Sequence, residues 1–411
     1  MIRAGRTNNM NQIETIDKNR PTAEWIESLR DRFPCEPEVD RFLTAKLHER
    51  ANPPYKPVSL EQLCDGFEKL LTANEITDFK INAPRWLTGG ASKLQMAFNL
   101  EWHPSSDQRV TTPMVLRMQP AESIVESSRL REFQLLKAIE GTVPVPQAYW
   151  VDNLGEYLPY PALVCGFVNG VTKPTQGTGG EVSGMGTHYG ERLRSLLAPQ
   201  FVSMLAAIHT FDWNLAELSA FEIPSPGTQA VERQFNWWRR VAEEDARTNL
   251  PIVTLAEQWL KKNMPAADKI SIVHGDYRCG NFLFDESSGA ITTWLDWELG
   301  HLGDHHEDLA WSTIRTWGHD DSESGEHYIC GLMTEAEFLT TYESASGLAI
   351  NPATLRYYKI LNAWKLVIMA LFCSYRVASR GKTHQDVLVA WCIGIAPKFT
   401  EQLAELLDEV I

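Results

Sequence analysis

Hydrophobic spacing changes several times along the chain, and each change predicts a different kind of element. Between about residue 21 and residue 72 the spacing is helical, with Leu63, Phe67 and Leu70 on one face. Ser59 precedes this face and has Gln three residues later, the pattern of a capping box. We therefore expect an N-terminal helical extension that packs on the chain that follows it.

Strict alternation replaces the helical spacing at residues 94–102, where every second residue is apolar. Alternation of this kind predicts a half-buried strand. A second strand is predicted roughly at 114–118, and a helix at 122–140. The apolar run 162–165 then ends a β-rich region.

The rest of the chain has mainly helical spacing. The exceptions are a short strand at 270–273 and a hairpin formed by 282–284 and 290–296. The glycine-rich stretch 172–190 predicts a mobile loop, either a lid over a site or a plain surface insertion.

We divide the chain into a disordered tail at 1–20, a helical extension plus a β-rich lobe at 21–165, and a helical lobe at 166–411. This order predicts an α+β, bilobal, protein-kinase-like fold, with a β-rich N-terminal lobe and a mainly helical C-terminal lobe.

Composition narrows the possible partners. The 411 residues carry a formal charge of −15 at pH 7, which argues against a nucleic-acid partner. The seven cysteines form no Cys-x-x-Cys pair, as is typical of a reducing compartment. The N-terminal residues lack the apolar core of a signal peptide, and the apolar run 366–373 is too short to span a bilayer. We expect a cytoplasmic protein with no membrane partner; its oligomeric state is left open.

Three polar residues near the predicted hairpin have the order that phosphoryl transfer requires. Asp276 follows the strand at 270–273, Asn281 lies five residues later, and Asp296 ends the hairpin. Such a reaction needs one carboxylate to orient the attacking hydroxyl, and an amide and a second carboxylate to hold Mg²⁺ on the nucleotide phosphates. Asp276 is thus the candidate catalytic residue, and Asn281 and Asp296 are the candidate metal ligands. The alternative is that all three are turn residues.

The same segment resembles the aminoglycoside phosphotransferase family, which is choline- and homoserine-kinase-like. His274–Asn281 is similar to its His-Gly-Asp-x-x-x-x-Asn loop, and Leu295–Glu298 to its metal-binding segment. The segments 302–304 and 307–311 continue the similarity, which covers roughly residues 81 to 399. The Tyr-Arg-x-Gly-Asn ending of the loop resembles a branch that includes kinase domains fused to some acyl-CoA dehydrogenases, as does Arg233–Trp238.

The resemblance implies a nucleotide site that binds ATP and Mg²⁺. Arg117 would contact the α- and β-phosphates, and Glu132 would be its ion-pair partner. A solvent-facing pair of Arg129 with Glu132, three residues apart on a helix, is the alternative. The backbone at Cys165 and Phe167 would bind the adenine.

The loop at 88–93 would cover the phosphates. Gly89 and Gly90 allow backbone amides to approach a phosphate closely, and Ser92 lies beside them. Adjacent glycines before a strand are equally typical of a simple turn.

A second polar cluster lies at residues 301–308 and could hold Zn²⁺ or Mn²⁺. Adjacent residues such as His305 and His306 seldom face one ion, however, and the resemblance implies that Asp304 and Asp308 are structural anchors. The family usually has Pro where His305 stands. We expect a packing role for His209.

The sequence predicts a small-molecule kinase that moves the γ-phosphate of ATP to a hydroxyl group of a small-molecule substrate. A metal-dependent phosphoesterase and a non-catalytic nucleotide-binding pseudokinase are the alternatives. The acceptors known in the family, which include aminoglycosides, choline, homoserine, methylthioribose and hydroxyacyl thioesters, are not distinguished by any motif.

Overall fold

A computed structural model gives the arrangement of the chain. It describes residues 16–53, 57–87, 93–104, 108–175, 184–322, 324–380 and 386–411. The predicted tail, the loop at 88–93 and the glycine-rich stretch 172–190 therefore lie wholly or partly outside the described residues.

The N-terminal lobe is built on a five-stranded antiparallel sheet with strand order β1-β2-β3-β5-β4. Its strands are β1 (Lys80–Trp86), β2 (Leu94–Trp102), β3 (Val110–Met118), β4 (Ala148–Asp152) and β5 (Ala162–Gly166). The alternation of residues 94–102 corresponds to β2, whereas β3 begins earlier than predicted. Strands β1 and β4 were not predicted. In β1 the burial does not alternate and Pro84 interrupts the strand, whereas β4 alternates in burial but has only five residues, too few for its pattern to be assigned from the sequence.

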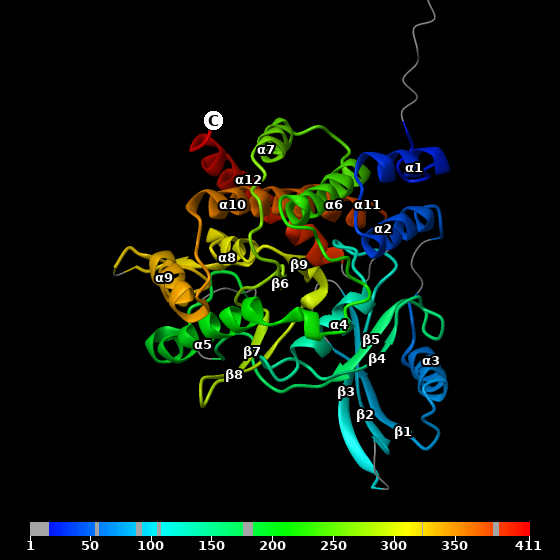
Figure 1. The fold of residues 1–411 in the computed structure, drawn as a ribbon. Coiled ribbons are helices and arrows are strands. Elements are labelled where there is room, and N and C mark those ends of the chain that lie inside the picture. The colour runs from blue at the N-terminus through cyan, green and yellow to red at the C-terminus, as the bar shows by residue number, and fades with distance from the viewer. Residues whose placement is uncertain are drawn as a thin grey trace, which may run out of the picture.

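Two helices pack on this sheet. Helix α3 (Leu60–Ala73) has the predicted capping box and buries Leu63 and Phe67 against one face of the sheet. Helix α4 (Arg129–Ile139) lies between the sheet and the helical lobe (Figure 1). It begins seven residues later than the prediction of 122–140, because the Ser128 side chain caps it there.

The C-terminal lobe is mainly helical, as predicted. Its helices are α5 (Gly190–Thr210), α6 (Gln229–Asp245), α7 (Pro251–Lys262), α8 (His306–Ser312), α9 (Glu335–Ser346), α10 (Pro352–Val367), α11 (Ser374–Arg380) and α12 (Asp386–Asp408). Short strand pairs complete it: β6 (Ser271–Val273) with β9 (His301–Gly303), β7 (Phe282–Asp285) with β8 (Ala290–Trp294), and β10 (His319–Asp320) with β11 (His327–Tyr328). The bilobal, kinase-like α+β fold is thereby confirmed.

The N-terminal extension divides between the two lobes. Whereas α3 joins the sheet, α1 (Ala23–Arg32) and α2 (Pro37–Glu49) lie beside α6 and α11 of the helical lobe (Figure 1). Phe42 of α2 meets Trp237 of α6 edge to face, with ring centroids 5.6 Å apart. The domain limit at residue 165 stays a prediction, but α1 and α2 pack with the lobe beyond it.

A π-helical turn, Ile368–Cys373, connects α10 to α11 in one continuous helical run. By length and composition the run Pro352–Arg380 could cross a membrane, but 83% of its most apolar window is buried inside the fold. Burial of this extent is that of a core helix, which agrees with the interpretation of 366–373 as a buried segment.

Candidate active site

The loop that carries Asp276 leaves β6 through a turn that only glycine fits. Gly275 has φ of +79°, and a Cβ there would lie 2.7 Å from the Leu299 carbonyl oxygen. Its left-handed backbone turns the chain after β6, directly before Asp276. The hairpin β7–β8 then brings the chain back to Asp296.

Four hydrogen bonds from three side chains hold the Asp276 carboxylate and its backbone carbonyl. The Trp311 indole donates to Oδ1 at 2.7 Å, and Arg278 Nε donates to the same atom at 2.8 Å. Asn281 Nδ2 donates to Oδ2 at 2.6 Å and to the backbone carbonyl at 2.9 Å. The side chain is 19% exposed, so the carboxylate is fixed in orientation while remaining accessible.

Burial raises the pKa of Asp276 above its ordinary value, although Arg278 and His274 act in the opposite direction. A raised pKa makes a carboxylate a better proton acceptor. Trp311 and Arg278 were not among the predicted site residues. The separation of Trp311 from the motif by a helix and a hairpin explains why no local pattern indicated it.

Asn281 and Asp296 are brought together by a backbone hydrogen bond, because Leu295 N donates to Asn281 O at 2.7 Å. Asp296 itself adopts the left-handed conformation, with φ of +59° and ψ of +50°. This conformation is uncommon outside glycine and is typical of functional turns. The Asp296 side chain is 42% exposed, the most accessible carboxylate of the group.

Arg117 joins the two lobes by contacting a carboxylate on each. Its Nη1 lies 2.6 Å from Glu132 Oε1 on α4, and its Nη2 lies 2.6 Å from Asp296 Oδ1. Arg117 and Glu132 are both buried, which fits the functional pairing rather than a solvent-facing pair. Arg129 also contacts Glu132, but inside the protein, so both interpretations of the sequence named true contacts.

Lys93 is a second basic residue near the candidate metal ligand Asp296, and the sequence analysis did not single it out. Lys93 Nζ is 2.7 Å from Glu298 Oε2, and its side chain is fully buried. Burial works against ionisation of Glu298, but Lys93 and Arg129 outweigh it and hold the Glu298 pKa at about 2. Lys93 is the last residue of the predicted phosphate loop at 88–93 and immediately precedes β2, so a cation lies where that loop meets the sheet.

Asp308 holds the first residues of the loop that carries Asp276. It accepts hydrogen bonds from His274 N at 2.7 Å and from Gly275 N at 2.8 Å, and it contacts His209 Nε2 at 3.1 Å. All of these groups are buried. The expectations that Asp308 is a structural anchor and that His209 has a packing role are both supported by these contacts.

The connection between the lobes differs from the simplest expectation for adenine binding. Cys165 is the penultimate residue of β5, and Phe167 follows that strand. The amide of Gly166 donates to Gln147 O at 2.8 Å, and that of Phe167 donates to Pro113 O at 2.9 Å. These two amides already have protein partners, so a purine at this connection would need other groups.

Three of the residues between 301 and 308 lie close enough to share an ion: Asp304, His305 and His306. His306 Nδ1 lies 2.6 Å from Asp304 Oδ1, however, and its Nε2 accepts from Asn351 N at 2.9 Å. With both His306 nitrogens hydrogen-bonded, the cluster is better explained as the cap of α8 than as a metal site. Gly89, Gly90 and Ser92 lie outside the described residues.

Comparison with known proteins agrees with this fold. The profile of the phosphotransferase enzyme family, abbreviated APH, matches residues 99–358. The chain belongs to this family, and the resemblance inferred from the sequence is confirmed.

Similar proteins include acyl-CoA dehydrogenase family member 10 of Mus musculus, which is 27% identical over 207 residues. Family member 11 of Rattus norvegicus is 25% identical over 275 residues. These matches cover 49% and 64% of this chain, but only 18% and 34% of the relatives, so the chain spans little more than a third of their length at most.

Among solved structures, a candidate aminoglycoside phosphotransferase from Ralstonia eutropha superimposes with a TM-score of 0.61. The match covers 84% of this chain and 98% of that one at 20% sequence identity. At this identity the likeness establishes the shared fold.

Proposed function

We propose that the protein is an ATP-dependent kinase that phosphorylates a hydroxyl group of a small molecule. The observation that carries the proposal is the Asp276 carboxylate, which Trp311, Arg278 and Asn281 hold between the lobes. Membership of a phosphotransferase family supports the same reaction class.

The residues at the cleft fit a magnesium nucleotide. Asn281 uses its amide nitrogen to hold Asp276, so its oxygen is available for a metal, and Asp296 offers a partly exposed carboxylate. Oxygen atoms of these kinds are the ligands that Mg²⁺ prefers. When bound, Mg²⁺ would neutralise the charge on the β- and γ-phosphates.

The protein's own groups would do the remaining work. Arg117, fixed by Glu132, would contact the nucleotide phosphates from the N-terminal lobe. Asp276 would orient the acceptor hydroxyl and receive its proton at Oδ2, because Oδ1 already accepts from Trp311 and Arg278. Positioning of this kind supplies most of the catalysis in phosphoryl transfer.

The proposal is tested by a Mg-ATP-dependent transfer assay on a panel of hydroxyl compounds. The panel contains an aminoglycoside, choline, homoserine, methylthioribose and a hydroxyacyl thioester, the last because the matched relatives are named as acyl-CoA dehydrogenase family members. We expect one class to give turnover that disappears with EDTA.

The alternatives give different results in the same assay. Hydrolysis of phosphate esters without nucleotide would indicate a phosphoesterase. Stabilisation by Mg-ATP without transfer to any acceptor would indicate a non-catalytic nucleotide-binding protein.

A further inference from the structure

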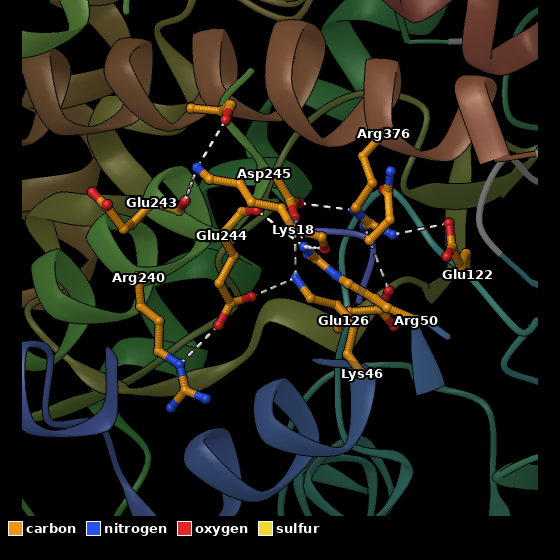
Figure 2. Close-up of polar contacts among 12 residues, drawn as sticks. Lys18, Lys46, Arg50, Glu122, Glu126, Arg240, Glu243, Glu244, Asp245 and Arg376 are labelled. Atoms are coloured by element: carbon orange, nitrogen blue, oxygen red, sulfur yellow. Dashed lines mark hydrogen bonds and ion pairs between the residues drawn. The ribbon is translucent and has the colours of Figure 1, made fainter. Parts of the chain in front are cut away.

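A network of buried charges joins the N-terminal extension to the helical lobe. None of the network residues named below belongs to the candidate active site. Asp245 at the end of α6 lies at the centre of the network (Figure 2). Arg376 Nε is 2.9 Å from one Asp245 oxygen, while Lys46 and Arg50 of the extension contact the other. Because these side chains are almost fully buried, their geometry is fixed by the fold.

A cavity of about 520 Å³ opens beside this network. Its lining is formed by Asn19, Arg20, Arg50, Ala51, Arg247, Tyr375, Ser379 and Arg380. Four of these eight residues are arginines, and none is acidic. Although the protein has a net charge of −15, arginine is thus the only charged residue type in the described lining of this cavity.

The two inner arginines are held in place from behind. Arg380 Nε donates to Glu122 at 2.5 Å and Nη1 donates to Asn19 Oδ1 at 2.8 Å. Arg50 donates to the carbonyl oxygens of Lys18 and Glu244, each at 3.0 Å, besides contacting Asp245. Arg380 Nη2 also contacts the Arg50 carbonyl oxygen. These contacts fix both guanidinium groups in the inner wall and pair their charges with Glu122 and Asp245, so the charge available to an anion must come from the two outer arginines.

The two outer arginines supply charge that the protein does not neutralise nearby. Arg247 Nη2 lies 2.5 Å from Asn19 Oδ1, an uncharged partner. Within the described parts of the chain, neither Arg20 nor Arg247 forms an ion pair with a carboxylate. Lys18, beside them, has a lowered pKa, chiefly through burial, and the positive charges of Arg50 and Arg247 add to that effect.

We propose that this cavity binds the phosphate group of a small organic phosphate. Planar guanidinium groups match phosphate oxygens in pairs, and several of them together favour a dianion over a single carboxylate. The cavity volume lies in the range of small-molecule sites, about 300–1,000 Å³, which favours a metabolite over a macromolecule. The Tyr375 side chain, 51% exposed at the cavity, offers a ring for the organic part of the ligand.

The test is calorimetric titration of the full chain with inorganic phosphate and with phenyl phosphate, at matched ionic strength. We expect saturable binding of both, and tighter binding of phenyl phosphate. The double variant Arg20→Gln/Arg247→Gln should bind about tenfold more weakly, because two charge-assisted hydrogen bonds are lost. Both side chains are at the cavity rim, so the variant should keep the wild-type melting temperature.

Two further variants locate the site. Arg278→Gln, at the transfer cleft, should leave phosphate affinity unchanged, and Tyr375→Ala should remove the advantage of phenyl phosphate. The proposal is overturned if neither anion binds saturably, or if the affinity falls with Arg278→Gln and not with the double variant. If the wild type bound the two anions with equal affinity, the proposed contact between the Tyr375 ring and the organic part of the ligand would be wrong.

Discussion

Two clusters of charged residues in this protein contain the same types of side chain but differ in how far their carboxylates are exposed to solvent. At the candidate active site, Asp296 is 42% exposed and Asp276 is 19% exposed. In the network between the extension and α6, the Asp245 and Glu244 side chains have no exposure at all. The first cluster keeps its carboxylates accessible to a ligand, whereas the second uses them to hold segments of the chain together.

The pKa shifts express the same difference. Burial raises the pKa of Asp276, and its neighbouring cation Arg278 does not compensate fully. Burial also acts on Asp245, but Arg376, Lys46 and Arg50 outweigh it and hold the pKa well below its usual range. An incompletely compensated carboxylate costs stability and gains reactivity, as is typical of catalytic sites.

The largest expected effect distinguishes the two clusters by activity. Asp276→Asn should lower the transfer rate by about 10²–10⁴-fold, because the proton acceptor is removed. Nucleotide binding should persist, since Arg117, Asn281 and Asp296 remain. Turnover of the identified acceptor and titration with a fluorescent ATP analogue measure the two quantities. Full activity in this variant would show that Asp276 is not the base.

A smaller but still large effect on stability is expected from the corresponding change in the other cluster. Asp245→Asn should lower the free energy of unfolding by about 3–5 kcal/mol, because it leaves buried cations uncompensated. Urea denaturation measures the change.

Glu243→Gln, two residues earlier on α6, is the matched control for Asp245→Asn. Glu243 is 31% exposed and its ion pairs with Arg239 and Arg32 are at the surface. Its loss should cost at most about 1 kcal/mol. Equal costs for the two variants would contradict the contrast between buried and exposed charge.

The smallest effect is a dependence on pH. The pKa of Asp245 is lower in the folded than in the unfolded chain, so its stabilisation is present above the unfolded value of about 3.9 and is lost as the pH falls below it. The difference in unfolding free energy between wild type and Asp245→Asn should therefore shrink at acid pH, by at most about 1.4 kcal/mol per pH unit. Denaturation curves between pH 7 and pH 3 measure this difference; a constant value would argue against a lowered pKa.

The contribution of Asp276 to the free energy of unfolding should depend on pH in the opposite direction. Its folded pKa is raised, so its contribution is most favourable at low pH and is lost as the pH rises through the folded value.

The sequence was most informative where the functional residues are close along the chain. The order of Asp276, Asn281 and Asp296 follows from one strand, one loop and one hairpin, so local spacing was enough to place them. The pair of Arg117 with Glu132 was expected from the family resemblance, and the structure shows this ion pair.

Long-range contacts were not predictable in this way. The Trp311 donor to Asp276, the Lys93 pair with Glu298 and the contacts of Arg376 with Asp245 each join separate elements. Their positions depend on how helices pack, and the hydrophobic spacing of one segment contains no information on that. For the same reason the sequence did not show that α1 and α2 pack with the helical lobe.

The π-helical turn at Ile368–Cys373 sets the phase of one long helical run. Before the turn, Lys365 contacts Glu307, the neighbour of Asp308, at 2.6 Å; after it, Arg376 reaches Asp245. Deleting one residue there would rotate all that follows by about 100° around the helix axis. Arg380 would then lose its contacts with Asn19 and Arg50 of the extension, and Arg376 its contact with Asp245, while Lys365 kept its place. The extra residue of the π-turn therefore sets which face of α11 meets α6 and the extension.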